Sequence, residues 1–290
     1  RYSHRVNWGA VFCLSYLKST ERQVGIVRIE LASAGFSVGK VDILGETTLA
    51  MGDKKITVLL GPNGAGKSTI LRLLSGAILP SIGQVLLQGK PLNDYSLAQR
   101  SRCLGVLTQD NTLDFPFSVA EVIGMGQIPH DARPGLGILT ETIVDLMIER
   151  FGLAPDRIYT TLSGGEKQLV HIARVLVQVW GLGSGACVLL DEPMAALDLR
   201  HQKLVVSLLL ELANAGTSQV IVMHDINLAA EFADEIVLVS GGAVVARGAP
   251  EVVMTADTLG QTFATEMLVV NDSVSGQKFY RAAMAPWSKR

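Results

Sequence analysis

The chain has 290 residues, 48% hydrophobic and 18% charged, a mixture that supports a large buried core and excludes a disordered or fibrous protein. Its 25 Lys and Arg against 27 Asp and Glu give a net charge of −2, so no basic excess favours nucleic acid as a partner. The 3 cysteines are too few for a disulfide framework or a cysteine-rich zinc site, and the longest uncharged run, Val175–Leu190, is too short for a transmembrane helix.

The chain begins with a segment that carries no chemical motif. Residues 1–26, with the apolar patch Trp8–Leu17, are interpreted as a leader or a start-site artefact, because the patch is short and no clear cleavage site follows it. The continuous apolar run Ile56–Leu60 is typical of a parallel strand buried on both faces. A predicted helix, Ser68–Leu74, and a predicted hairpin, Gly83–Pro91, come next.

The rest of the chain alternates helical and strand patterns, which predicts an α/β core with a helical insertion at about residues 112–162. Residues 27–255 are expected to form the main domain, and residues 256–290, which lack strong periodicity, a small C-terminal tail. The predicted elements are helices over Thr140–Phe151, Gly164–Trp180 and the stretch with Leu204, Leu208 and Leu212, strands Cys187–Leu190 and Val220–Met223, a hairpin over Glu235–Gly248, and a surface loop at Gly181–Gly185.

Functional groups follow the three predicted buried strands at their carboxyl ends. Asp191 follows one strand, His224 follows another, and a glycine-rich loop that begins at Gly61 follows the third. Ligands of open α/β sheets bind beyond the carboxyl ends of the strands, so these positions predict one site at one edge of the sheet.

The glycine-rich loop matches the phosphate-binding pattern G-x-x-x-x-G-K-[ST] in full. Its glycines let backbone N–H groups turn toward phosphate oxygens, and the helix that follows directs its positive end at the same anion. Lys67 supplies a cation for the β- and γ-phosphates, and the Ser68 hydroxyl is a candidate Mg²⁺ ligand. The predicted nucleotide-binding residues of this loop are Gly61, Pro62, Asn63, Gly64, Ala65, Gly66, Lys67, Ser68 and Thr69.

Two carboxylates, Asp191 and Glu192, follow the predicted strand Cys187–Leu190. Asp191 is predicted to hold Mg²⁺, directly or through water, and Glu192 to orient or deprotonate the attacking water. Many strands end in acidic residues, so this assignment depends on the phosphate loop upstream of the pair.

The segment Leu162–Glu166 supports two interpretations. Ser163 and Glu166 have the spacing of a capping box, which explains these two residues by helix formation alone. A capping box does not explain Gly164 and Gly165, because each glycine in a helix costs about 1 kcal/mol relative to alanine. Glycines suit a helix end that an anion approaches closely, so we infer a second phosphate-binding helix terminus in the same chain.

Taken in order, these motifs resemble those of the ATP-binding subunits of ABC transporters, over roughly Val27–Val253. Leu162–Glu166 is similar to the signature motif of that family, and Ala196–Asp198 to its D-loop. The resemblance implies an α/β fold: a P-loop NTPase (RecA-like) core with an antiparallel β subdomain and an inserted α-helical subdomain. It also implies a twofold dimer in which each ATP lies between the phosphate loop of one copy and, on the other copy, Ser163, Gly164, Gly165 and Asp198.

The same resemblance gives roles to three isolated residues. Gln109 corresponds to the Q-loop glutamine that senses the metal, and His224 to the switch histidine that holds the γ-phosphate and the water in line. Phe36 lies where the family has an aromatic ring that stacks on adenine, with a core aromatic as the alternative. Leu169 and Met194 depart from the family, which usually has Arg and Thr there, and are expected to affect turnover and dimer communication rather than nucleotide binding.

The activity that the resemblance implies is ATP hydrolysis coupled to import, at the cytoplasmic face of a bacterial inner membrane. The implied partners are a second copy, two integral-membrane permease subunits and, indirectly, a periplasmic substrate-binding protein. Phe115–Phe117 is a candidate docking surface for a permease loop, with a buried aromatic cluster as the alternative. A nucleic-acid or ribosome ATPase is less favoured, because the chain has one cassette and no heptads, and a catalytically weak regulatory subunit is suggested only by Leu169 and Met194.

A finer resemblance, to hemin import ATP-binding proteins, implies hemin as the cargo. A ferric siderophore or cobalamin is the alternative within the same importer group. Cargo in that family passes through the membrane subunits, so His130 and His201 are not expected to bind haem. The stretches that carry this resemblance, the last of them weakly, are Leu113–Ile123, Ile128–His130, Leu197–Gln202 and Ser275–Gln277.

Overall fold

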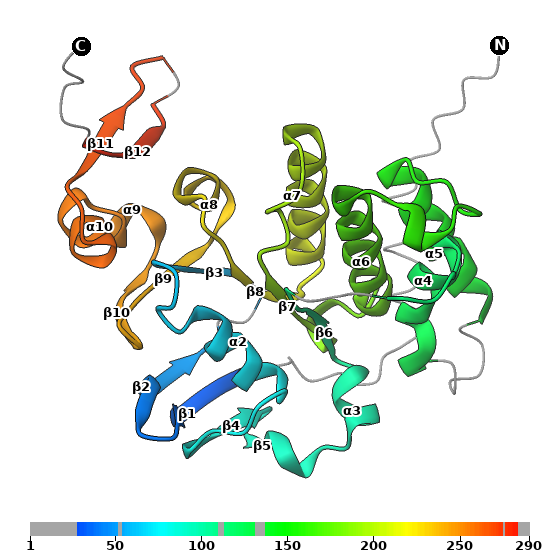
Figure 1. Cartoon of the computed structure of the whole chain (residues 1–290), viewed down its shortest axis with the longest axis horizontal. Helices are drawn as coiled ribbons and strands as arrows, with labels where there is room; N and C mark the ends of the chain where they lie inside the picture. The colour runs from blue at the N-terminus through cyan, green and yellow to red at the C-terminus, as the bar shows by residue number, and fades with distance from the viewer. Residues whose placement is uncertain (1–27, 52–53, 110–112, 131–136, 275, 284–290) are drawn as a thin grey trace.

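A central sheet of six strands organises the computed structural model, which describes residues 28–51, 54–109, 113–130, 137–274 and 276–283 (Figure 1). Its strand order is β10-β9-β3-β8-β7-β6, and every neighbouring pair is parallel except β10 with β9. All residues of β3, β7 and β8 are buried, as expected of parallel strands covered on both faces. The strands are β3 (Ile56–Leu60), β6 (Leu104–Leu107), β7 (Cys187–Asp191), β8 (Ser218–Val222), β9 (Glu235–Ser240) and β10 (Ala243–Gly248).

An antiparallel sheet lies on one side of the central sheet, with helix α2 (Lys67–Ser75) packed between the two (Figure 1). The apolar face of α2 is fully buried together with residues of both sheets. This packing holds the loop between β3 and α2 in place from both sides. The order of the antiparallel sheet is β2-β1-β4-β5, with β1 (Ile29–Val38), β2 (Val41–Ala50), β4 (Ile82–Leu87) and β5 (Lys90–Pro91).

Helices within residues 113–130 and 137–162 form the helical insertion that the sequence predicts, and α6, which follows them, packs on β6 and β7 of the central sheet. Helix α6 contacts α4 and α5 as well as the sheet, so it links the insertion to the core. Among the described residues, no helix has the length and apolar character needed to cross a bilayer. The elements are η1 (Leu92–Asp94), α3 (Leu97–Ser101), α4 (Val119–Gly124), η2 (Met125–His130), α5 (Gly137–Phe151), η3 (Tyr159–Thr161), α6 (Gly164–Val179), η4 (Gly183–Gly185), α7 (Leu199–Asn214) and α8 (Ile226–Phe232).

The C-terminal segment, which the sequence predicts to be a small tail, contains regular elements that pack on the core within its described residues. Leu259, Met267 and Tyr280 are buried in the main hydrophobic cluster. The Asn227 side chain of α8 holds the backbone of Tyr280, donating from Nδ2 to its O at 3.0 Å and accepting from its N at 2.7 Å. The elements of the segment are short, so they give little periodic signal: α10 (Ala256–Phe263), β11 (Met267–Asn271) and β12 (Lys278–Ala282). Helix α9 (Pro250–Val253) precedes them.

One expectation lies outside the described residues. The interpretation of residues 1–26 as a leader falls in the undescribed segment, and so stays a prediction. The α/β architecture, with its antiparallel sheet and helical insertion, is confirmed by the described residues.

Candidate functional site

Glycines shape the loop between β3 and α2. A Cβ at Gly61, which has φ +154°, would lie 2.0 Å from the carbonyl oxygen of Val239, so no side chain fits there. Gly66, with φ +103°, is the N-cap of α2, and no side chain caps the first amides of that helix. The positive end of α2 therefore opens onto the loop, as an anion site requires.

Lys67 is the cation of this loop. Its Nζ donates hydrogen bonds to the carbonyl oxygens of Gly61 and Pro62, both at 2.7 Å. Burial lowers the pKa of the Lys67 ammonium, and two nearby carboxylates raise it. Gly64 has φ +74°, and, its chain neighbours aside, none of the described residues has an atom within 4 Å of the position of a Cβ there. A buried cation beside an open turn of backbone fits the terminal phosphates of a nucleotide.

Ser68 of α2 and Asp191 at the end of β7 meet beside the loop. The Ser68 Oγ donates to Asp191 Oδ1 at 3.2 Å. Asp191 is buried, which raises the pKa of its carboxyl, while the hydrogen bond from Ser68 lowers it. Hydroxyl and carboxylate oxygens are ligands that Mg²⁺ prefers, so this donor set fits the metal that the sequence predicts.

Glu192 and His224 follow the adjacent strands β7 and β8, and Glu192 Oε1 lies 2.5 Å from His224 Nε2. Glu192 has φ +50°, which is uncommon for a residue with a side chain, and its N–H donates to the Val222 carbonyl at 3.0 Å. This left-handed turn directs the chain out of the sheet directly after Asp191. A carboxylate fixed against an imidazole at this edge can accept a proton from water.

Gln109 and Phe36 come from different sheets. Gln109 is exposed and follows β6, whose neighbour in the sheet is β7, so both strands end at the same edge. Phe36 of β1 is half-buried, pairs with Leu44 in the sheet, and packs against the core around α2. Phe36 thus packs as an aromatic at the margin of the core, with part of its ring accessible.

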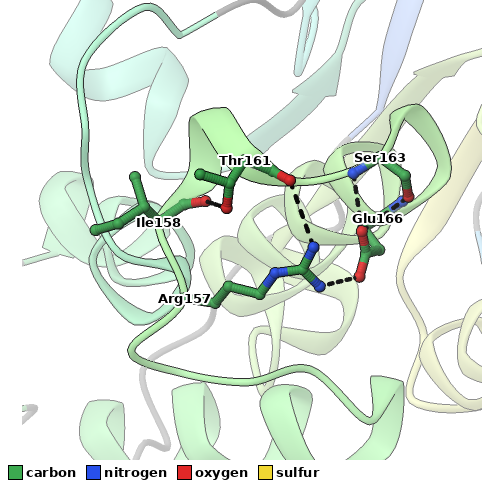
Figure 2. Close-up of polar contacts among 5 residues, drawn as sticks. All are labelled: Arg157, Ile158, Thr161, Ser163 and Glu166. Carbon is green, nitrogen blue, oxygen red and sulfur yellow. Dashed lines mark hydrogen bonds and ion pairs between the residues drawn. The ribbon is translucent and has the colours of Figure 1, made fainter.

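The capping box predicted at the start of α6 is present, as Figure 2 shows. The Glu166 N–H donates to Ser163 Oγ at 3.3 Å, and the Ser163 N–H and O–H each lie 2.8 Å from Glu166 Oε2. Among the described residues, no hydrogen bond joins Ser163 to the phosphate loop. Helix capping therefore accounts for the Ser163 and Glu166 geometry within one copy of the chain.

The two glycines of this motif have different surroundings. A Cβ at Gly165 would lie 2.9 Å from the carbonyl oxygen of Ala196, so close packing against the segment before α7 requires this glycine. At Gly164, apart from its chain neighbours and its own helix backbone, no atom of the described residues lies within 4 Å of the Cβ position. Packing within the chain thus explains Gly165, and only Gly164 still requires the explanation that a ligand approaches it.

The segment after Glu192 contains structural residues. Asp198 caps α7, with Oδ1 accepting from the His201 N–H at 2.9 Å, and this bond lowers the pKa of the Asp198 carboxyl. The two departures from the family pattern, Leu169 and Met194, are buried in the main hydrophobic cluster. Leu169 therefore makes apolar contacts at the position where the family usually has an Arg and its polar contact.

The aromatic stretch before α4 combines both interpretations made from the sequence. Phe115 is 67% exposed, whereas Phe117 is half-buried and packs on the main cluster, with 6.0 Å between the ring centroids. His130 is buried and its Nε2 lies 2.9 Å from the Gln178 carbonyl oxygen, a helix-packing contact.

Two contacts at the site carry no local sequence signal. Arg157 forms an ion pair with Glu166, and its Nη2 donates to the Thr161 carbonyl at 3.4 Å (Figure 2). Gly242, in the turn between β9 and β10, donates its N–H to the Ala65 carbonyl at 3.0 Å and so braces the phosphate loop. The first contact lies within residues 157–166, whereas the second joins segments that only the folded chain brings together.

Comparison with known proteins places these motifs in a family context. The family model described as "ABC transporter" matches residues 44–195. The hemin import ATP-binding protein HmuV of Rhodopseudomonas palustris is 37% identical over 260 residues, which cover 89% of this chain and 95% of that protein. The protein of the same name from Pseudomonas fluorescens is 40% identical over 233 residues, 80% of this chain and 90% of that protein.

Solved structures have the same fold. An ABC transporter assigned to the metal-chelate type, in an inward-facing conformation, matches with a TM-score of 0.70 and 25% identity, over 89% of this chain and 97% of that one. A dimeric ATP-binding cassette bound to ADP and Pi matches with a TM-score of 0.65 and 22% identity, over 77% of this chain and 98% of that one. These likenesses confirm the predicted fold class.

Proposed function

The chain belongs to the ABC transporter family of ATP-hydrolysing subunits, and we propose that it energises the import of hemin. One observation carries the proposal: the phosphate loop, the Ser68–Asp191 pair and the Glu192–His224 pair meet at one edge of the sheet. Support for hemin as the cargo comes from the names of relatives that span most of the chain. A ferric siderophore or cobalamin is the alternative cargo.

The chemistry assigns each group of the cluster one task. Glu192 accepts a proton from water as the water oxygen bonds to the γ-phosphorus, and the bond between that phosphorus and the ADP oxygen breaks. His224, hydrogen-bonded to Glu192, holds the γ-phosphate and the water in line. Lys67 and the amides at the start of α2 stabilise the negative charge that moves onto the leaving ADP.

Ser68 and Asp191 are proposed as the protein ligands of Mg²⁺, with Gln109 as a third group. The metal supplies charge neutralisation at the β- and γ-phosphates when it is bound. Gln109 starts from the strand next to Asp191 and leads into the helical insertion, so it links the metal position to that insertion. Phe36 is proposed to stack on the adenine with the accessible part of its ring.

A second copy of the chain is proposed to complete each site. Within one copy, Gly164 keeps open space above its helix end, and this end is not hydrogen-bonded to the phosphate loop in the described residues. A twofold dimer would place Ser163, Gly164, Gly165 and Asp198 of one copy over the nucleotide of the other, with two nucleotides in the dimer. The solved cassette with ADP and Pi is itself a dimer.

The remaining partners follow from the proposed role as an importer subunit. The exposed Phe115 beside the helical insertion is proposed to contact one of two integral-membrane permease subunits. The chain would then lie at the cytoplasmic face of the inner membrane and act with a periplasmic binding protein only through the permease. The net charge of −2 means that the chain has no excess of basic residues to favour nucleic acid as a partner.

The variant Glu192→Gln tests the proposed catalysis. It should bind ATP with an affinity close to that of the unmodified chain, lose about 100-fold or more of the steady-state hydrolysis rate, and accumulate an ATP-bound dimer. Hydrolysis, calorimetric titration and light scattering measure the three outcomes. Glu211→Gln, which removes a carboxylate from a surface ion pair with Arg150, is the control. Unchanged hydrolysis in the Glu192 variant would remove Glu192 from its role.

A genetic experiment tests the cargo. A strain that lacks this chain should fail to grow on hemin as its iron source and still grow on a ferric siderophore. Expression of the unmodified chain should restore growth on hemin, and expression of the Glu192→Gln variant should not. The opposite nutrient pattern would assign the cargo to the alternative class.

A further inference from the structure

A carboxylate lies at the helix end that the proposed dimer needs for phosphate binding. Glu166 is in the first turn of α6, where its Oε2 accepts from the N–H and O–H of Ser163. These bonds lower the pKa of the Glu166 carboxyl, with a smaller contribution from Arg157, so the group is ionised at neutral pH. The carboxylate is thus needed to orient Ser163, yet its charge has the same sign as a nucleotide phosphate.

Arg157 supplies the opposite charge at this position. Its Nη1 pairs with Glu166 Oε1, the oxygen on the far side of the carboxylate from the Ser163 bonds (Figure 2). Its Nη2 also donates to the Thr161 carbonyl at 3.4 Å, which directs the guanidinium along the segment that enters α6. The pair is partly exposed, with 44% of the Arg157 and 33% of the Glu166 side chain accessible, so an isolated pair here would add little stability.

The Arg157 segment does not depend on that ion pair for its position. The Val119 N–H donates to the Arg157 carbonyl at 2.9 Å, and the Tyr159 N–H donates to the Phe117 carbonyl at 2.8 Å. These backbone bonds hold residues 157–159 against the start of α4. Loss of the Arg157 side chain should therefore change the local charge while the backbone stays in place.

We propose that Arg157 is a positioning residue that neutralises Glu166, so that this carboxylate can hold Ser163 and order the start of α6 without repelling the phosphate that binds there. The inference rests on the proposed ATP-bound dimer and extends it to a residue outside the sequence motifs. The inference predicts that the net charge of the Arg157–Glu166 pair controls phosphate binding at the start of α6. An uncompensated carboxylate there repels a multiply charged phosphate and weakens the binding of that phosphate.

Three variants set the net charge of the Arg157–Glu166 pair. The unmodified pair is neutral, Arg157→Ala leaves −1, Glu166→Gln leaves +1, and the double variant is neutral again. Glutamine keeps a side-chain oxygen that can accept the Ser163 hydrogen bonds, so the capping geometry survives the change. Lys167→Ala is the matched control, since it removes a cation of the same turn whose Nζ lies 5.5 Å from the Tyr159 ring rather than on Glu166.

The measurement is the ATP concentration that half-saturates dimer formation, in full-length chains that also carry Glu192→Gln. Arg157→Ala should raise this concentration about tenfold, which is about 1.4 kcal/mol. Glu166→Gln should lower it or leave it within about twofold, and the double variant should return to within about twofold of the parent, effects expected of a partly exposed charge. The Arg157→Ala defect should shrink at 0.5 M salt, because screening weakens the repulsion.

Three results would overturn the inference. The first is a double variant as defective as Arg157→Ala, which would make Arg157 a tether rather than a neutraliser. The second is an equal defect in Lys167→Ala, which would reduce the effect to overall charge. The third is the absence of an ATP-dependent dimer in the parent, the chain that carries only Glu192→Gln. This result would refute the proposed dimer and, with it, this inference. A calorimetric titration measures the affinity of each variant for ATP at the phosphate loop, and this affinity should match that of the parent. A variant that folds poorly would instead lose ATP binding at the phosphate loop as well.

Discussion

The change Gly164→Ala should stabilise the free chain while it weakens the ATP-bound dimer. Gly164 is the first residue of α6, and its φ is not positive. In the part of the chain that the structure describes, no atom outside its own helix turn and chain neighbours lies within 4 Å of the position of a Cβ. Alanine is better than glycine in helices by up to about 1 kcal/mol, and the gain at a helix end is smaller, about 0.5 kcal/mol. The free energy of unfolding in urea, without nucleotide, should rise by this amount.

The same methyl group should oppose a phosphate at this helix end. A hydrogen bond from the backbone to a charged group contributes about 1.5–3 kcal/mol, so the loss of one such contact predicts about 10- to 100-fold more ATP for half-maximal dimer formation. Light scattering across an ATP titration, in the Glu192→Gln background, measures that concentration. Calorimetric binding of ATP to the phosphate loop should not change.

Gly165→Ala is the contrasting variant. Its Cβ would lie 2.9 Å from the Ala196 carbonyl oxygen, so the segment before α7 must shift by a few tenths of an ångström. The strain should cancel the gain in helix propensity, and the free chain should not become more stable. If Gly164→Ala forms the dimer at the ATP concentration of its parent, no phosphate approaches Gly164, and the signature helix end has no nucleotide-binding role.

Two further substitutions test other parts of the structure. Lys67→Ala removes the loop cation that reaches the Gly61 and Pro62 carbonyls, and should weaken ATP binding about 10-fold or more in a calorimetric titration, since a charged contact contributes about 1.5–3 kcal/mol; wild-type affinity would contradict the phosphate-loop assignment. Asn227→Ala removes both hydrogen bonds to the Tyr280 backbone and should lower the free energy that holds the β11–β12 hairpin on α8 by about 1 kcal/mol. The hairpin should then detach more often, and a protease should cleave faster between β11 and β12. Asn227→Asp, which keeps an acceptor for the Tyr280 N–H, should be cleaved at an intermediate rate, and equal cleavage of all three chains would show that Asn227 does not fasten the hairpin.

The sheet edge was predictable because its signals are local and its geometry is general. Ile56–Leu60 and Cys187–Leu190 are apolar runs, and parallel strands bring their carboxyl ends to the same edge. That rule brings the loop after Ile56–Leu60 close to Asp191, and the phosphate-loop motif puts Ser68 at the end of that loop. The two side chains are hydrogen-bonded in the structure.

The contacts that sequence reasoning missed join distant segments. The tie between Asn227 and Tyr280 spans 53 residues, and its hydrogen bonds on one side use backbone atoms that any residue has. The reason for Gly165 is the carbonyl of Ala196, a position that depends on the turn after β7. The exposure of Phe115 next to the half-buried Phe117 could not be read from the sequence, because both are the same residue type and only the packing around α4 separates them.

The backbone hydrogen bonds between residues 117–119 and 157–159 offer a route between a contact at Phe115 and the start of α6. They connect the stretch that carries the exposed Phe115 directly to the segment that carries the Arg157–Glu166 pair. Coupling between two binding events is reciprocal. If the proposed binding of a membrane partner at Phe115 raises the affinity for ATP by some factor, then ATP binding must raise the affinity for that partner by the same factor.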